Sequence, residues 1–347
     1  MQPYIHHLVL FKIQLTQEEI INAFAQLGTR LASISIDDTL LQKAHIHNNW
    51  FTPQWQLYAL NYWGVKLNVT DLNKWAGKYT FTNSPKKVGL IMAGNIPLVG
   101  MHDLVCILLS GHKAIVKPSS DDPVLTPWII NELIKIDSRF ENRIELVEKL
   151  NDCEALIATG SNNTARYFEH YFSSVPKIIR KNRNSIAILT GNETDEELRA
   201  LANDIFAYFG LGCRNVSKLM VPEDYNFNRF FEALESYKEF GNHNKYFNNY
   251  TYHKAIFLMN IVPHLDNGFL LVKEDDKIAS PLGALFTSTY KEKNDIIEYL
   301  DKNRESIQIV IGNSDFIKEC IPFGQSQNPN LYEYADDIDT MKFLNQL

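Results

Sequence analysis

The chain has 347 residues, of which 45 % are apolar and 22 % are charged. This is the composition of a globular protein, and the length suits one large core or two domains of ordinary size. A disordered or fibrous protein is excluded. The apolar runs are all far shorter than the roughly 18 residues that a bilayer span requires, so we expect no membrane span.

The formal net charge is −7, and lysine and arginine are scattered along the chain rather than clustered. Nucleic-acid-binding domains usually carry a concentrated basic surface, so we expect a small-molecule partner and no nucleic acid. The N-terminal string MQPYIHHLVLF lacks the cationic lead and the small-residue cleavage site of a secretory signal. We therefore expect a cytoplasmic protein in a reducing compartment, with its cysteines as thiols.

Strand and helix patterns alternate through the first half of the chain. Short apolar runs predict strands, and stretches of helix-like apolar density lie between and after them. Alternation of this kind is typical of a parallel sheet that helices cover on both faces. The predicted strands are residues 88–92, 113–116, 143–147 and 155–158, and the predicted helices are 103–110, 127–136 and 163–172.

The second half repeats the pattern. An Asn-rich interval at residues 241–253 predicts an exposed loop. Together the two halves predict the α/β class, with two lobes, parallel-rich sheets and an interlobe cleft. The predicted strands are residues 185–189, 217–221, 255–261 and 307–311, and the predicted helices are 194–209, 227–240 and 291–303.

Three predicted loops follow strands of the first sheet. Ligands of open α/β sheets bind beyond the carboxyl ends of the strands. We therefore expect residues 93–97, 117–121 and 159–163 to lie together on one rim.

Six short motifs occur in the order and rough spacing of the aldehyde dehydrogenase superfamily. Within it, the chain most resembles the NADPH-dependent acyl-CoA reductases that supply fatty aldehyde to bacterial luciferase, because it also carries VKPSSDDP and a C-terminal FGQSQNPNLYEYADDIDTMKFL. The resemblance covers most of the chain. The six motifs are GNIPLVG (94–100), IVKPSS (115–120), TGS (159–161), GLGC (210–213), SPLG (280–283) and PFG (322–324).

The resemblance implies an aldehyde dehydrogenase-like fold and a division of the chain into three parts. Residues 1–190 would form a Rossmann-like cofactor-binding domain, and residues 191–320 a catalytic domain that carries Cys213. Residues 321–347 would return to the cofactor lobe or contribute to an oligomer interface, and a homo-oligomer is a possible assembly.

Cys213 is the predicted nucleophile. A thiolate attacks a thioester readily, becomes the acyl carrier and releases another thiol of similar basicity. Buried cysteines are more often packing residues, but Cys213 follows Gly210 and Gly212, whereas Cys106 lies inside the apolar string VCILL. Arg214 beside it could favour the thiolate, or could equally be solvated or paired structurally, and receives no role.

Asn95 matches the superfamily asparagine whose amide, with the backbone N–H of the cysteine, holds the oxyanion of the tetrahedral intermediate. Two neutral donors stabilise developing negative charge without losing a proton. An asparagine after a glycine is also common turn chemistry, so the surrounding GNIPLVG string carries this assignment.

The resemblance also implies a nicotinamide cofactor. Lys117, with Ser119 nearby, matches the lysine that reaches the adenosine ribose, although a plain surface lysine would look the same. Ser120 stands where many NAD-preferring relatives place a carboxylate, and losing that carboxylate removes its repulsion of a 2′-phosphate. We therefore expect NADPH in preference to NADH. The remaining implied cofactor-binding residues are Thr159, Gly160 and Ser161, at a helix start that suits anions, together with Ile91, Met92 and Leu282.

Two departures from the superfamily pattern concern missing carboxylates. Residues 178–185, IIRKNRNS, contain no acid where aldehyde-oxidising relatives have the Glu that activates water. An acyl-Cys213 intermediate would then persist against water, which favours thioester reduction. Ser280 stands where relatives have the Glu that holds the nicotinamide ribose, and Leu282 stands for the Phe of the same string, so a weaker hold on the cofactor is expected.

Metal binding is not predicted. The histidines His6, His7, His45, His47 and His243 have no carboxylate or further histidine at a regular ligand spacing.

The leading hypothesis is thus an NADPH-dependent reductase of an acyl-CoA or another acyl thioester. The alternatives are a reductase of another activated carboxylate, such as an acyl phosphate, and a non-catalytic subunit that binds only nucleotide or a partner. The presence of both Cys213 and Asn95 favours an enzyme.

Overall fold

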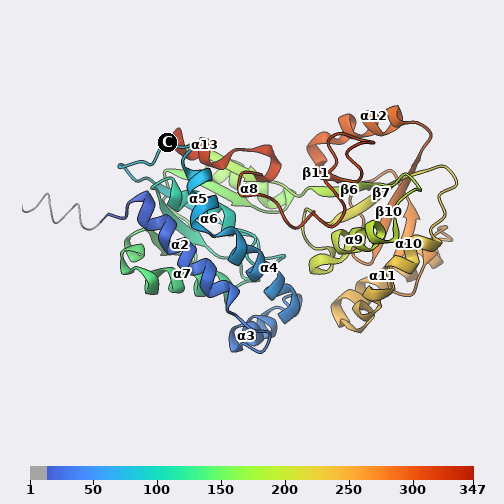
Figure 1. The fold of residues 1–347 in the computed structure, drawn as a ribbon, viewed down its shortest axis with the longest axis horizontal. Coiled ribbons are helices and arrows are strands. Elements are labelled where there is room, and N and C mark those ends of the chain that lie inside the picture. The colour runs from blue at the N-terminus through green and yellow to red at the C-terminus, as the bar shows by residue number, and fades with distance from the viewer. Residues whose placement is uncertain (1–13) are drawn as a thin grey trace, which may run out of the picture. The chain divides into compact units, whose positions relative to one another are not determined.

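The computed structural model describes residues 14–347, and these form two compact units (Figure 1). Unit 1 contains the described residues up to Lys181 together with Asn330–Leu347, and unit 2 is Asn182–Pro329. The chain therefore enters unit 2 once and returns from it once. Within residues 14–347, no helix is both long enough and apolar enough to cross a membrane.

Unit 1 begins with four helices that the sequence patterns did not delimit. Each starts at a polar side chain that accepts a hydrogen bond from the first helical turn, which satisfies one of the backbone donors left open at a helix start. The four N-caps are Thr16, Asp38, Thr52 and Asn68. The helices are α2 (Gln17–Ala32), α3 (Thr39–His47), α4 (Pro53–Lys66) and α5 (Val69–Ala76).

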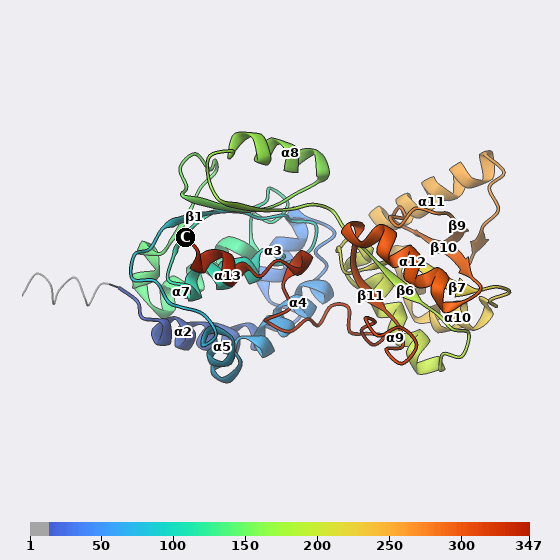
Figure 2. The same ribbon diagram turned by 90° about the horizontal axis from the view of Figure 1, so that it is seen from above.

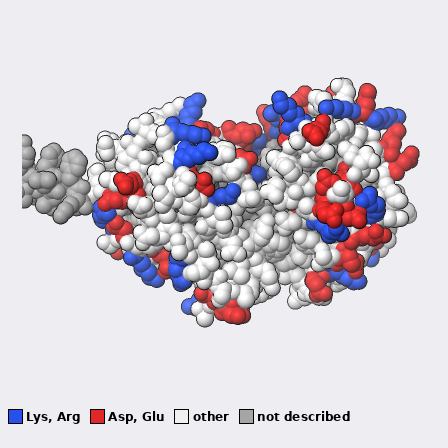
Figure 3. Space-filling model, in the orientation of Figure 1, with Lys and Arg blue, Asp and Glu red and all other residues white. Residues whose placement is uncertain are grey.

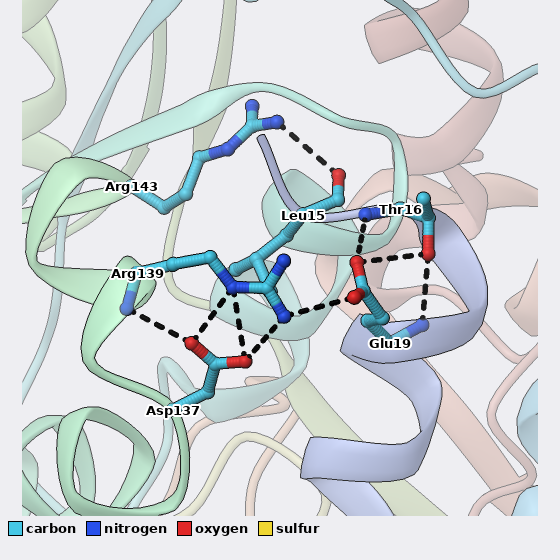
Figure 4. Close-up of polar contacts among 6 residues, drawn as sticks. All are labelled: Leu15, Thr16, Glu19, Asp137, Arg139 and Arg143. Carbon is cyan, nitrogen blue, oxygen red and sulfur yellow. Dashed lines mark hydrogen bonds and ion pairs between the residues drawn. The ribbon is translucent and has the colours of Figure 1, made fainter. Parts of the chain in front are cut away.

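The start of α2 is held by a cluster of charged side chains (Figure 4). Thr16 and Glu19 form a reciprocal capping box. Arg139 joins Glu19, at 2.9 Å, to Asp137 at the beginning of the 3₁₀ helix η1 (Ser138–Asn142). These contacts connect α2 to a segment more than a hundred residues further along the chain.

The sheet of unit 1 is fully parallel, with the order β3-β2-β1-β4-β5. The predicted strands and helices of this half are confirmed, and β5 is an additional strand. The elements are β1 (Lys87–Ile91), α6 (Met101–Leu109), β2 (Lys113–Lys117), α7 (Leu125–Ile136), β3 (Ile144–Leu146), β4 (Ala155–Thr159), α8 (Asn162–Tyr171) and β5 (Lys177–Arg180).

The sheet of unit 2 has the order β11-β6-β7-β10-β9-β8 and is parallel except for the β8–β9 pair. Figures 1 and 2 show α12 on one face of this sheet and α9 on the other. The strands are β6 (Asn184–Ile188), β7 (Val216–Pro222), β8 (Leu265–Asp266), β9 (Leu271–Glu274), β10 (Ala284–Tyr290) and β11 (Ile307–Ile311). The helices are α9 (Asp195–Phe206), α10 (Asn228–Ala233), α11 (Asn244–Met259) and α12 (Lys293–Asn303), with 3₁₀ segments η2 (Ala207–Gly210), η3 (Glu235–Asn242) and η4 (Arg304–Ser306). Strand β6 falls inside the range 1–190 predicted for the first domain, but it pairs with β7 and β11 of unit 2.

Two predictions in this half were wrong. Residues 241–253 were expected to form a loop and 255–261 a strand, whereas α11 covers most of both ranges. The helix buries Tyr246, Tyr250 and Phe257 and leaves its three asparagines exposed or half-buried. A short apolar run has the same appearance in the sequence whether it forms a strand or a helix. Here it belongs to a helix.

The C-terminal segment packs onto unit 1. It contains η5 (Ala335–Asp337) and α13 (Thr340–Asn345). Leu331, Met341 and Leu344 are buried in the same core cluster as α6 and β1. On the face drawn in Figure 3, acidic and basic side chains are interspersed on both units.

Candidate functional site

The carboxyl ends of three strands meet at one edge of the unit 1 sheet. In the register of the sheet, Ile91 of β1 is level with Lys117 of β2 and Ala158 of β4. The loops that follow these strands therefore share this edge, as predicted. The strand order also changes direction between β1 and β4, and such a switch point is where open α/β sheets bind their ligands.

The loop after β1 passes very close to the loop after β2. A Cβ atom added to Gly94 would lie 2.5 Å from Oγ of Ser119, so only glycine allows this approach. Asn95, the next residue, is exposed. The predicted oxyanion donor and the predicted ribose-binding loop are thus neighbours on the rim.

The loop after β2 is fixed from both sides. Oγ of Ser119 accepts a hydrogen bond from the backbone N–H of Asp121, and the buried side chain of Asn48 donates to the Asp121 carbonyl at 3.2 Å. Oδ1 of Asp122 accepts a hydrogen bond from the backbone N–H of Leu125, the first residue of α7, and burial raises the pKa of the Asp122 carboxyl. Lys117 and Ser119 remain half-buried, and Ser120 is exposed.

The turn after β4 leads directly into α8. Ser161 is the N-cap of this helix, and its Oγ accepts from the Thr164 N–H at 3.2 Å. The N–H of Gly160 donates to the Arg180 carbonyl of β5 at 3.2 Å. Thr159 and Gly160 are half-buried, whereas Ser161 is exposed.

Ile91 and Met92 have side chains that face the core, with 8 % and 6 % of the residue exposed. They could offer a ligand only main-chain atoms. The rim as a whole fits a dinucleotide, because it combines the switch point, a glycine that permits close approach, the cation of Lys117 and a helix start.

Cys213 differs from the other cysteines in its exposure. Cys106 and Cys320 are buried, Cys153 is half-buried, and Cys213 is exposed. Burial raises the pKa of Cys106 and Cys153, and raises that of Cys320 to about 12. Thiolates are the reactive form, so burial disfavours those three as nucleophiles.

The loop that carries Cys213 has an unusual backbone. Tyr208, Phe209 and Gly210 have φ angles of 52°, 60° and 80°, so three successive residues adopt the left-handed conformation. Such strain persists only where surrounding contacts fix it. The turn reverses the chain between α9 and β7 and leaves Cys213 on its surface.

Asn215 supplies those contacts. Its side chain is buried, with 2 % of the residue exposed. Its Oδ1 accepts from the Gly212 N–H at 2.8 Å, while its Nδ2 donates to the carbonyls of Ala207, at 2.8 Å, and Asp204, at 3.1 Å. Ser185 of β6 donates to the carbonyl of Cys213 itself at 2.9 Å. Sequence reasoning singled out none of these supporting roles.

A second loop is bound to the cysteine loop. Nε of Arg214 donates to the Ser326 carbonyl, so this arginine has a structural partner. The Asp204 carboxylate accepts from the N–H groups of Gly324, at 2.6 Å, and Ser326, at 3.0 Å, and burial raises its pKa. The PFG motif is therefore attached to the segment that carries Cys213.

Leu282 lies in the turn before β10, in unit 2, whereas the other predicted cofactor-binding residues are in unit 1. A Cβ atom on Gly210 would lie 3.8 Å from its side chain, so Leu282 borders the cysteine loop. Ser280 donates to the Ala284 carbonyl at 2.7 Å.

Among residues 14–347, no three His, Cys, Asp or Glu side chains gather closely enough to hold a metal ion. His6 and His7 lie outside the described residues.

The fold is that of the aldehyde dehydrogenases. The aldehyde dehydrogenase KauB from Pseudomonas aeruginosa superimposes with a TM-score of 0.66 at 13 % identity, over 88 % of this chain and 74 % of that one. Indole-3-acetaldehyde dehydrogenase, solved with NAD⁺, gives a TM-score of 0.63 at 14 % identity, over 89 % and 76 % of the two chains.

Residues 71–318 match the family model described as acyl-CoA reductase (LuxC), and the chain belongs to that family. The long-chain acyl-protein thioester reductase 2 of Photobacterium leiognathi is 21 % identical over 168 residues. This match covers 43 % of the chain and 35 % of that relative.

Proposed function

We propose that this protein reduces an acyl thioester, such as a fatty acyl-CoA, to an aldehyde with NADPH, through a thioacyl intermediate on Cys213. The observation that carries the proposal is the family match together with the exposed Cys213 on a backbone loop fixed by buried contacts. The relative in Photobacterium leiognathi carries the name of an acyl-protein thioester reductase, which is chemistry of the same class.

In the proposed mechanism the Cys213 thiolate attacks the thioester carbonyl and forms a tetrahedral oxyanion. The Asn95 amide and the Cys213 backbone N–H donate hydrogen bonds to that oxyanion. Collapse expels the CoA thiolate and leaves the acyl group on Cys213. No carboxylate at residues 178–185 is available to activate water there, so the acyl group is retained for reduction.

The nicotinamide cofactor, when bound, supplies the hydride. Lys117 and Ser119 would hold the adenosine ribose, and Thr159, Gly160 and Ser161 would face the nicotinamide and pyrophosphate side. Reduction gives a hemithioacetal on Cys213, and its collapse returns the thiolate and releases the aldehyde. Ser120 carries no carboxylate that would repel a 2′-phosphate, so we propose NADPH in preference to NADH.

The proposal also covers the cellular compartment and the oligomeric state. A reducing cytoplasm would keep Cys213 as a thiol, and a homo-oligomer is the proposed assembly, which light scattering on the purified protein would measure.

The test is direct labelling. The protein is incubated with labelled acyl-CoA and the adduct is located by mass spectrometry, with Cys213→Ala and, as a matched control, Cys320→Ala. We expect label on Cys213 in the wild type and in Cys320→Ala, and none in Cys213→Ala. Equal labelling of wild type and Cys213→Ala would remove Cys213 as the nucleophile.

The donor and the cofactor are separated in the same assay. Acyl phosphate offered beside acyl-CoA distinguishes the thioester reductase from the reductase of another activated carboxylate. Chase of the labelled enzyme with NADPH should release aldehyde faster than chase with NADH. A stable adduct that neither nucleotide discharges would contradict the reductase.

A further inference from the structure

Arg180 supports the turn after β4 with its backbone. It is the last residue of β5 and lies opposite Thr159 in the register of the sheet. Its carbonyl accepts the Gly160 N–H at 3.2 Å. Any shift of the Arg180 backbone is therefore passed directly to the Thr159–Gly160 peptide.

The side chain of Arg180 joins two further elements. The residue is 5 % exposed. Nη1 forms an ion pair with Asp103, in the first turn of α6, and Nη2 donates to Oγ1 of Thr340 at 2.8 Å. Thr340 is completely buried and is the first residue of α13. Arg180 thus connects the rim turn, through its backbone, with the helix after the Asn95 loop and the C-terminal segment, through its guanidinium.

The cluster has few contacts for a buried charge. Nε of Arg180 and Oδ1 of Asp103 are buried without a hydrogen-bond partner. A buried ion pair that loses one of its partners is strongly destabilised, because the remaining charge cannot reach water. Thr340 supplies one of the two side-chain hydrogen bonds that orient the guanidinium, and Asp103 accepts the other.

We propose that Arg180 is a positioning residue for the cofactor turn at residues 159–161, and that Thr340 of the C-terminal segment sets the orientation of its side chain. The inference rests on the proposed function, since it takes the role of that turn from it. It also gives a role to the C-terminal segment Asn330–Leu347: through Arg180, this segment supports the turn at residues 159–161.

The test uses Thr340→Val, which keeps the shape of the side chain and removes the hydroxyl, with Thr340→Ser as the rescue variant. Amide hydrogen exchange at Gly160 is measured in the full chain without nucleotide. Loss of one buried hydrogen bond corresponds to a change of roughly fivefold. We expect exchange at Gly160 to quicken, and the Kd and KM for NADPH to rise, by about that factor in Thr340→Val and to return in Thr340→Ser. The rate of Cys213 acylation by labelled acyl-CoA should stay at the wild-type value.

Tyr79→Phe is the matched control. The Tyr79 hydroxyl donates to the Asp339 carboxylate at 2.8 Å and accepts from the Tyr334 hydroxyl at 2.9 Å, so this variant removes two hydrogen bonds to the same segment without touching Arg180. It should lower thermal stability but leave Gly160 exchange and NADPH affinity unchanged. Arg180→Lys, which cannot form the two-pronged contact, should exceed Thr340→Val in both readouts.

The inference is overturned if Thr340→Val and Arg180→Lys, both folded, keep wild-type exchange at Gly160 and wild-type NADPH affinity. It is also overturned if Tyr79→Phe has the same effect as Thr340→Val, because the segment would then act only as a general clamp. Failure of the wild type to bind NADPH would instead refute the proposed function, and exchange at Gly160 would still decide whether Arg180 positions the turn.

Discussion

One buried amide holds the loop of the proposed nucleophile. Asn215 contacts Gly212 on one side and the end of α9 on the other, so its removal leaves several backbone groups without partners. We expect Asn215→Ala to lower the free energy of unfolding by about 2–3 kcal/mol. Acylation of Cys213 by acyl-CoA should slow by at least about tenfold, because thioester attack requires a precise approach.

For Asn215→Ala, the rate of Cys213 alkylation by iodoacetamide is compared with the rate of its acylation by acyl-CoA. Cys213 is already exposed, so alkylation should change far less than acylation. Asn260→Ala is the matched control, since Asn260 is an exposed residue of unit 2 that donates to the Ile256 carbonyl. Acylation of Asn215→Ala at the wild-type rate would show that the loop holds its conformation without the amide.

The sequence allowed Cys213 to be proposed but not its supports. The neighbouring glycines and the motif order distinguish Cys213 from Cys106, and the exposure of Cys213 agrees with that choice. The contacts of Asp204 with Gly324 and Ser326 join residues about 120 positions apart. A local sequence pattern cannot predict such a contact, because the two segments become neighbours only in the folded chain.

At the scale of elements, burial explains why three strands of unit 1 could be predicted, although the mostly buried β10 was not. Strands β1, β2 and β4 are buried on both faces, so each appears in the sequence as a short apolar run that a glycine or proline closes. Helix α11 has apolar residues on several sides and asparagines in its first half. Neither a period of 3.6 nor a strand alternation is visible there, and tertiary packing decides the outcome.

The attachment of α2 to η1 makes stability depend on pH. Hydrogen bonds from the Thr16 backbone and from Arg139 lower the pKa of the Glu19 carboxyl. Hydrogen bonds chiefly from Arg139 lower the pKa of the Asp137 carboxyl. Groups with a lowered folded-state pKa stabilise the fold above their unfolded-state pKa values, near 4, and lose that contribution as the pH falls through the folded-state values.

We expect Arg139→Gln to reduce the free energy of unfolding by about 1 kcal/mol at pH 7, because the pairs are partly exposed. The difference from wild type should shrink between roughly pH 4 and pH 2, where the carboxylates become protonated. Urea unfolding across this range measures it. A difference that stays constant with pH would mean that Arg139 contributes by packing and not by charge.

At the scale of the whole molecule, the two units differ in how the chain completes them. Unit 2 is one continuous stretch, Asn182–Pro329, whereas unit 1 requires Asn330–Leu347 to return. This segment adds Leu331, Met341 and Leu344 to the core of unit 1. Burial of a leucine or methionine side chain stabilises a core by roughly 2–5 kcal/mol relative to alanine, so the segment is a structural part of unit 1.

A chain that ends at residue 329 should therefore lose stability in unit 1 alone. Hydrogen exchange followed by mass spectrometry should show lost protection in β1, α6 and β5 and retained protection in β7 and β10. Met341→Ala with Leu344→Ala in the full chain should give the same distribution in a milder form, because the two changes remove apolar contacts but keep the hydrogen bond between Arg180 and Thr340. Equal loss of protection in both units would show that they unfold as one cooperative body, and unchanged protection in unit 1 would show that its core is complete without the returning segment.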